Sequence, residues 1–327
     1  MSANNVNYLV PAGKGKFNDR GISRFAEIVQ SWDGQKKVEG FGIVGVPLSK
    51  TSISHSGAAF APEAIRRALS SFTTYSIQDE IDLKDERIWD MGDVLMHVTN
   101  LLDSQQRIES ALSELFQAHP LMTPLILGGD HSISCPSIKA FSKGYKKVGV
   151  IQFDAHHDLR EIKNEHGGPS NGTPFRGLLE SGTISGENLV QIGIRDFSNG
   201  KLYHDYAKEQ GIKIYTMKDV REREIIHILE ESVSYLAQKV DAIYLSVDMD
   251  VLDQAFAPGC PAIGPGGMDS SQLMRGIEYL STVPLVKAMD IVEIDPTLDI
   301  RDMTSRVAAM LLILFVKGKR KLEHPTL

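Results

Sequence analysis

The sequence predicts an α/β protein built on a mostly parallel sheet of about eight strands. Short apolar, β-branched runs recur along the chain, at residues 41–46, 88–91, 125–127, 148–153, 189–194, 212–215, 242–247 and 286–292. Nearly solid apolar runs are typical of parallel strands buried on both faces, and stretches with helical periodicity separate most of them. We therefore expect a three-layer α/β/α arrangement, with helices on both faces of one sheet.

The stretches between these runs carry helix signals. In residues 61–69, Pro62 stands in the first turn and apolar residues follow at positions i, i+3 and i+4. The same spacing occurs in residues 102–116 and 225–236. Each of these stretches is therefore expected to form a helix that packs on the sheet.

The domain organisation follows from the position of the candidate site residues, which are spread along the chain and must meet. One continuous sheet explains this more simply than two domains. Residues 1–35 are polar and are expected to form an N-terminal extension, with a partial helix near residues 22–32. Residues 36–327 are then expected to form a single domain.

The composition excludes several classes of protein. The chain has 327 residues, a net charge of −7 and 42% hydrophobic residues, an ordinary globular composition with no basic run to bind nucleic acid. The longest apolar run, Val307–Val316, is too short to cross a bilayer. Met1–Asn5 lacks the basic and apolar regions of a secretory signal, and Cys135 and Cys260 are too few for a disulfide framework. We therefore expect a cytoplasmic protein with no membrane partner.

Acidic and imidazole side chains follow three of the apolar runs where each run ends. Asp154, His156 and Asp158 occupy alternate positions, and residues spaced by two along an extended chain point the same way. The same spacing by two recurs after residues 242–247, in Asp248 and Asp250. In proteins with parallel sheets, binding sites lie beyond the carboxyl ends of the strands. These side chains are therefore expected to converge there. The candidate metal ligands are His131, Asp154, His156, Asp158, Asp248 and Asp250.

This set of residues indicates a binuclear hydrolytic centre. Taken singly, each acid could be a helix cap or a surface residue, and each histidine a packed polar residue. Together, the carboxylates would repel one another unless a cation lay among them. An oxygen-rich set without cysteine favours Mn²⁺ over Zn²⁺, although Zn²⁺, Co²⁺ and Ni²⁺ are not excluded by ligand type. Six ligands are too many for one catalytic ion with an open position, so two ions sharing carboxylates are expected.

The three motifs resemble, in order, the metal motifs of the ureohydrolase superfamily of arginases, agmatinases and formimidoylglutamases. They are Gly128–Ser132, Asp154–Asp158 and Ser246–Asp253, and the likeness extends from about Phe41 to Phe315. The resemblance implies an arginase-like fold for residues 36–327, which would be a ureohydrolase catalytic domain. It also implies two Mn²⁺ ions per subunit, a hydroxide between them as nucleophile, and a homo-oligomer, either a trimer or a hexamer.

The resemblance further implies a role for each residue. One ion would be held by His131, Asp154, Asp158 and Asp248, and the other by His156, Asp154, Asp248 and Asp250. Asp158 would also pass a proton to the leaving nitrogen. Glu293, which follows residues 286–292, matches the carboxylate that pairs with the cationic C–N group of the substrate. Read alone, Glu293 could be a helix-start or surface acid.

Departures from the arginase pattern bear on the substrate. Arg160 stands where arginases carry an uncharged asparagine, and Asn171 replaces a proton-shuttling histidine, for which His166 could substitute. Ser198 replaces an aspartate that helps to hold the α-ammonium group of arginine. Compared with the arginase pattern, the site has gained the cationic side chain of Arg160 and lost an anionic side chain at Ser198. Because arginine binds carboxylates in a two-pronged way, a dianionic amino-acid derivative is the expected substrate.

Residues 171–176 and 193–197 resemble the formimidoylglutamase version of the pattern. These enzymes hydrolyse N-formimidoyl-L-glutamate to L-glutamate and formamide in histidine breakdown. The two carboxylates of this substrate are expected to bind Arg195 and Arg176, with Arg160 as the next candidate and Asn171 as a hydrogen-bond donor. Read alone, each arginine could instead have a surface or ion-pair role. Two rival functions remain: a hydrolase that releases urea from another guanidino or amidine compound, and a non-catalytic metal-binding protein.

Overall fold

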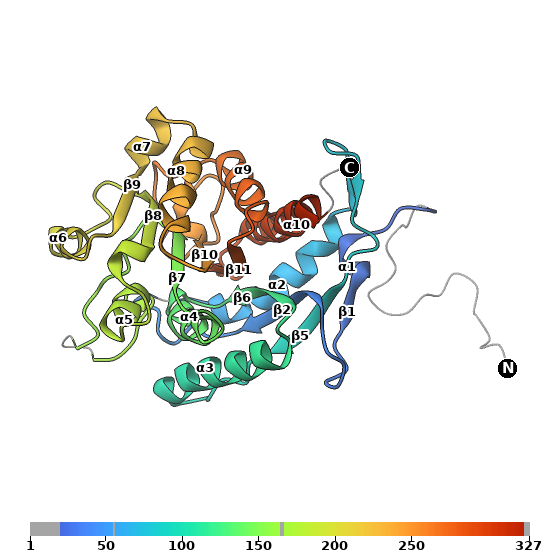
Figure 1. Ribbon diagram of the computed structural model, residues 1–327, viewed down its shortest axis with the longest axis horizontal. Helices are drawn as coiled ribbons and strands as arrows, with labels where there is room; N and C mark the ends of the chain where they lie inside the picture. The colour runs from blue at the N-terminus through green and yellow to red at the C-terminus, as the bar shows by residue number, and fades with distance from the viewer. Residues whose placement is uncertain (1–19, 55, 164–166, 324–327) are drawn as a thin grey trace.

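The computed structural model describes residues 20–54, 56–163 and 167–323, and a nine-stranded sheet forms its centre (Figure 1). In order across the sheet, the strands are β1 (Val29–Ser31), β5 (Ile88–Asp93), β2 (Gly40–Val46), β6 (Met122–Gly128), β11 (Val286–Val292), β10 (Ala242–Asp248), β7 (Val148–Phe153), β8 (Leu189–Ile194) and β9 (Lys213–Thr216). Every neighbouring pair in this sheet is parallel. A separate antiparallel pair is formed by β3 (Tyr75–Ser76) and β4 (Ile81–Asp82).

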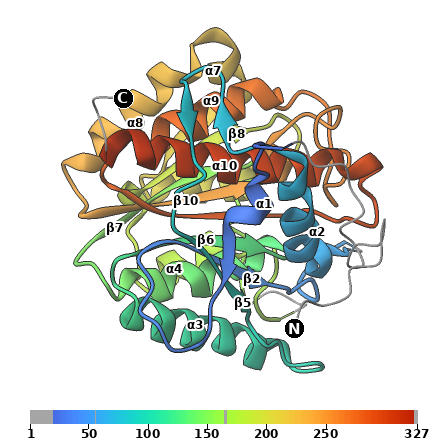
Figure 2. The same cartoon turned by 90° about the vertical axis from the view of Figure 1, so that its right-hand side faces the viewer.

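Helices cover both faces of the large sheet. One face packs against α1 (Phe25–Ile28), α2 (Ala61–Ala68), α7 (Met217–Glu222), α8 (Ile225–Ala237), α9 (Ser270–Ser281) and α10 (Met303–Glu323). The other face packs against α3 (Leu101–Ala118), α4 (Ser134–Ser142), α5 (Pro174–Glu180) and α6 (Lys201–Glu209). Figure 2 shows α3 and α4 below the sheet and α8, α9 and α10 above it.

The two hydrophobic cores follow from the alternation of side chains along the strands. In β2, Ile43 packs into the core beneath α2 and α10, whereas its neighbour Val44 packs into the core beneath α3 and α4. Both sides of the strand are therefore apolar, which explains the solid apolar runs of the sequence. The predicted three-layer α/β/α fold is confirmed.

The ninth strand, β1, is the one that the sequence did not predict. It has three residues, Val29–Ser31, and pairs with β5 at the edge of the sheet. A short, largely exposed edge strand carries no apolar run, so no pattern marks it. Residues 29–31 of the expected N-terminal extension thus belong to the sheet, while residues 1–19 lie outside the described part of the chain.

Four adjacent strands at the centre of the sheet, β6, β11, β10 and β7, end at the edge where the candidate ligands were expected. Gly129, just after β6, lies so close to the Leu48 carbonyl that a Cβ atom at this position would overlap it. This approach lets the Asp130 N–H donate to the Leu48 carbonyl (2.7 Å), which fixes the chain just before His131. Within the described residues, no helix is both long and apolar enough to span a membrane.

Candidate metal centre

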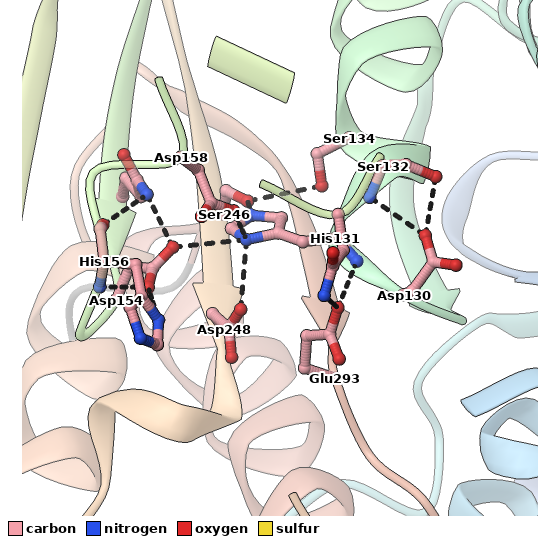
Figure 3. Close-up of polar contacts among 12 residues, drawn as sticks. Asp130, His131, Ser132, Ser134, Asp154, His156, Asp158, Ser246, Asp248 and Glu293 are labelled. Atoms are coloured by element: carbon pink, nitrogen blue, oxygen red, sulfur yellow. Dashed lines mark hydrogen bonds and ion pairs between the residues drawn. The ribbon is translucent and has the colours of Figure 1, made fainter. Parts of the chain in front are cut away.

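The first group of candidate ligands surrounds the ring of His131. This residue opens a short 3₁₀ turn, His131–Ile133, after β6, and its side chain is fully buried. Its Nδ1 atom lies 3.2 Å from Asp154 Oδ2, 2.9 Å from Asp158 Oδ2 and 3.1 Å from Asp248 Oδ2 (Figure 3). Asp154 follows β7 directly, Asp158 lies in the loop after it, and Asp248 ends β10, so two neighbouring strands bring the group together.

The second group lies beside the first and consists of Asp154, His156 and Asp250. His156 Nδ1 is 2.9 Å from Asp250 Oδ2 and 3.5 Å from Asp154 Oδ1. Asp154 therefore belongs to both groups, one oxygen facing each histidine. Asp248 belongs to the first group only, and its other oxygen accepts the backbone N–H of Asp250 (2.8 Å).

The donor set fits divalent cations. In each group the ligand atoms lie within 4.8 Å of one another, and four of the six side chains are buried, whereas His156 and Asp158 are partly exposed. His131 Nδ1 is close to three carboxylate oxygens, yet none is aligned to accept a hydrogen bond from it. Three carboxylate oxygens converge on one buried ring nitrogen. Because a single N–H cannot satisfy all three, these are surroundings that suit a cation.

The pKa values of the clustered aspartates, in the absence of bound ions, also indicate a site that suits a cation. Burial, and then the charge of Asp154, raises the pKa of Asp158 to about 6. Burial, and then the charge of Asp250, raises the pKa of Asp248 well above its ordinary value. Burial also opposes the ionisation of Asp154, but the two neighbouring histidines, His131 and His156, outweigh it and lower its pKa. The surroundings of Asp158 and Asp248 thus oppose their ionisation, and a bound cation would favour it.

Glu293 lies directly after β11 and reaches the same site. Its Oε1 atom accepts the backbone N–H of His131 (2.8 Å) and the Asn171 amide (3.3 Å). Its Oε2 atom is buried and has no hydrogen-bond partner among the described residues. Burial, and then the charge of Asp130, raises the pKa of Glu293 to about 8. The side chain therefore presents one unused acceptor, which suits a cationic group.

Two of the site carboxylates stand on left-handed backbone. Asp158 has φ +51° and Glu293 has φ +61°, a conformation that residues other than glycine rarely adopt. Each such residue costs on the order of 1 kcal/mol or more, and such strain is concentrated at functional sites. In both residues the backbone turns immediately after a buried strand or ligand loop and directs the side chain into the cluster.

A cavity of about 260 Å³ opens onto the two groups. Its floor includes His156, Asp158, Asp248, Asp250 and Glu293, and its walls include Ile53, Ser54, Arg160, Asn171 and Tyr203. The guanidinium of Arg160 lies 5.6 Å from the centre of the Tyr203 ring. Of the four predicted substrate-binding residues, the structure brings Arg160 and Asn171 to this cavity.

The other two arginines lie elsewhere. Arg176 donates to Glu180 (2.6 Å), and its guanidinium stacks 3.7 Å from the centre of the Tyr206 ring, so it does not line the cavity. Arg195 is buried, and its Nη2 atom donates to the carbonyls of Asp250 (2.5 Å) and Leu252 (3.0 Å). Arg195 thereby fixes the backbone that carries Asp250. His166, the suggested substitute proton carrier, lies outside the described residues.

A buried polar network behind His131 was not predicted from the sequence. His131 Nε2 lies 3.1 Å from Ser246 Oγ, which donates to Asp290 Oδ1 (2.8 Å). Ser134 Oγ (2.7 Å) and Tyr244 OH (2.9 Å) donate to Asp290 Oδ2. Ser246 and Asp290 are register partners in β10 and β11. The one available signal was that Ser246 precedes Asp248 by two residues and so points the same way.

Comparison with known proteins agrees with this geometry. The chain is 57% identical over 303 residues to the formimidoylglutamase of Halalkalibacterium halodurans, covering 93% of this chain and 94% of that protein. The solved structure of Bacillus subtilis formimidoylglutamase is 47% identical, covers 96% of each chain and superposes with a TM-score of 0.92. The arginase of Bacillus caldovelox is 30% identical over 83% of this chain and 95% of its own. The pattern of the arginase family matches residues 39–316, and the chain therefore belongs to that family.

Proposed function

We propose that the chain is a formimidoylglutamase, a hydrolase that cleaves the formimidoyl C–N bond of N-formimidoyl-L-glutamate to give L-glutamate and formamide. The observation that carries the proposal is one cavity that combines two oxygen-rich ligand groups with the unused buried acceptor of Glu293. Two relatives of nearly full coverage, at 57% and 47% identity, bear this enzyme name.

We propose two Mn²⁺ ions as the cofactors. His131, Asp154, Asp158 and Asp248 would hold one ion, and Asp154, His156 and Asp250 the other, with Asp248 as a second shared ligand as the motif resemblance implies. Bound divalent cations supply an activated water, because a cation lowers the pKa of the water it binds from 15.7 to roughly 7.

Glu293 positions the substrate for attack. Its Oε2 atom would accept the cationic formimidoyl group, so that a charge-assisted hydrogen bond holds the carbon above the ligand groups. Asp158 belongs to the first ligand group and also lines the cavity, where it can receive a proton from the attacking water. As the C–O bond forms and the C–N bond breaks, Asp158 would transfer that proton to the departing nitrogen of glutamate, and the formimidoyl carbon leaves as formamide.

Arg160 would bind a carboxylate of the substrate. It lines the cavity, whereas Arg176 and Arg195 do not: Nε of Arg176 donates to Glu180, and Nη2 of Arg195 donates to backbone carbonyls. An arginine at this position favours a substrate that carries an acid group at the end remote from the reacting carbon. The γ-carboxylate of formimidoylglutamate meets that requirement.

The experiment is product analysis with Mn²⁺-loaded protein offered formimidoylglutamate, agmatine, guanidinobutyrate and arginine in parallel. We expect glutamate and formamide from the first compound and no urea from the others. An Asp154→Ala variant serves as the inactive control, because it removes the carboxylate common to both ligand groups. Urea released from any of the other three compounds would contradict the substrate assignment while retaining the hydrolytic class.

A further inference from the structure

The side chain of Asn171 links a cavity loop to Glu293. Its Oδ1 atom accepts the backbone N–H of Ile53 (3.1 Å), and its Nδ2 atom donates to Glu293 Oε1 (3.3 Å). Its own N–H donates to the carbonyl of Thr51 (3.1 Å), so the loop around residues 51–53 is bonded to Asn171 at two points. The N–H of Ile53 can only donate, so the amide oxygen must face it and the amide nitrogen must face Glu293.

The same loop is tied to the other side of the site. The N–H and the hydroxyl of Thr51 both donate to the buried carboxylate of Asp130, the residue before His131. Glu293 in turn accepts the N–H of His131 and donates its own N–H to the carbonyl of Gly129 (3.0 Å). The carboxylate of Glu293 is thus fixed from two directions, by the backbone of His131 and by the side chain of Asn171.

We propose that Asn171 is a positioning residue that holds Glu293 with Oε2 free for the cationic group, rather than a residue that binds the substrate itself. The inference rests on the proposed function, in which Glu293 receives that group. Two donors occupy Oε1, and the remaining acceptor, Oε2, is buried at the cavity. Without the Asn171 donor, only the N–H of His131 holds Oε1, and the plane of the carboxylate can turn so that Oε2 no longer faces the cavity.

Two substitutions separate the bond to Glu293 from the bond to the loop. Asn171→Asp keeps an acceptor for the N–H of Ile53 but replaces the donor to Glu293 by a second carboxylate. Asn171→Ala removes both bonds. The matched control is Gln105→Ala, which deletes an amide that donates to Ser132 Oγ (2.9 Å), in the same polar surroundings but without contact to Glu293.

With formimidoylglutamate and Mn²⁺-loaded protein, we expect both Asn171 variants to lose about 10- to 100-fold in kcat/KM, because a hydrogen bond to a charged group is lost. Bound Mn²⁺ is expected to stay at the wild-type level, and Gln105→Ala is expected to stay within about threefold of wild-type kcat/KM. In a Glu293→Gln background, calorimetric titration with formimidoylglutamate should show that Asn171→Asp changes Kd less than about threefold, since no carboxylate remains to be held.

Crystal structures of the two Asn171 variants provide a readout that does not depend on the substrate. We expect the Glu293 carboxylate to be rotated in both, and the loop at residues 51–53 to be displaced in Asn171→Ala alone. An unmoved Glu293, wild-type kinetics in Asn171→Asp, or a change in Kd of more than about threefold caused by Asn171→Asp in the Glu293→Gln background would overturn the positioning role. A wild type that does not hydrolyse formimidoylglutamate would instead overturn the proposed function, and the crystal structures would then decide the role of Asn171.

Discussion

Replacing Asp290 by asparagine should weaken metal binding although Asp290 is not a ligand. When Nδ1 of His131 faces an ion, its Nε2 carries the proton and donates to Ser246 Oγ, whose hydroxyl donates to Asp290 Oδ1. Burial raises the pKa of Asp290, and the charge of His131 and three hydroxyl donors oppose that rise. The carboxylate therefore fixes both the tautomer and the orientation of the His131 ring.

The expected loss of metal affinity in Asp290→Asn follows from the number of hydrogen-bond acceptors that remain at position 290. Two hydroxyls, those of Ser134 and Tyr244, donate to Oδ2, so an amide oxygen at position 290 would take that place. The amide nitrogen would then face Ser246 Oγ and could not accept its proton; the nearest other acceptor, Ser134 Oγ, is 3.5 Å away. One hydrogen bond to a charged group is lost, which costs about 1.5–3 kcal/mol. Loss of such an outer contact typically lowers metal affinity about 10- to 100-fold.

The assay is Mn²⁺ titration of metal-free protein by calorimetry. Asp290→Asn should raise the Kd for Mn²⁺ by about 10- to 100-fold. Ser134→Ala should change it less than about threefold, because that variant removes a donor to Asp290 but leaves the path from His131 through Ser246 intact. Thermal unfolding with saturating Mn²⁺ checks that both variants fold. Equal affinity for wild type and Asp290→Asn would refute the reasoning.

Three further perturbations give distinct results. Asp154→Ala should abolish turnover and lower bound Mn²⁺ more than Asp250→Ala does, because Asp154 belongs to both ligand groups; metal analysis showing equal losses would contradict this. Since burial and Asp154 raise the pKa of Asp158 to about 6, protons compete with the ion below that pH, so Mn²⁺ affinity measured by calorimetry should fall as the pH is lowered from 7 to 5; a flat profile would argue against it. Burial opposes the ionisation of Asp79, but hydrogen bonds from Lys317 and Lys321 lower its pKa to about 2. Asp79→Asn should therefore cost about 1–2 kcal/mol of unfolding free energy at pH 7, measured with urea, and this difference should disappear as the pH falls through 3.8 toward 2.

The fold and the clustering of the candidate ligands were predictable because each depends on short-range patterns. Solid apolar runs identified eight of the nine strands, and ligands spaced by two after β7 and β10 identified the edge of the sheet at which they meet. In a parallel sheet, the end of a strand fixes where the following side chains lie, whichever strands are neighbours.

The residues that support the ligands were not predictable, because they depend on strand register and on loop paths. Ser246 and Asp290 are 44 positions apart and meet only because β10 and β11 pair in that register. The contacts of the arginines could not be predicted for the same reason. Charge type suggested that Arg195 faces a substrate, but its burial beside the loop after β10 engages it with the carbonyls of Asp250 and Leu252.

The most direct test of the binuclear hydrolase is a titration of metal-free protein with Mn²⁺, in which bound metal and formamide released from formimidoylglutamate are measured on the same samples. The structure predicts two ions per chain and formamide release that appears only as they bind, with chelation reversing both. Full turnover by chelated protein that retains almost no metal would contradict the account, as would saturation at one ion per chain with full activity.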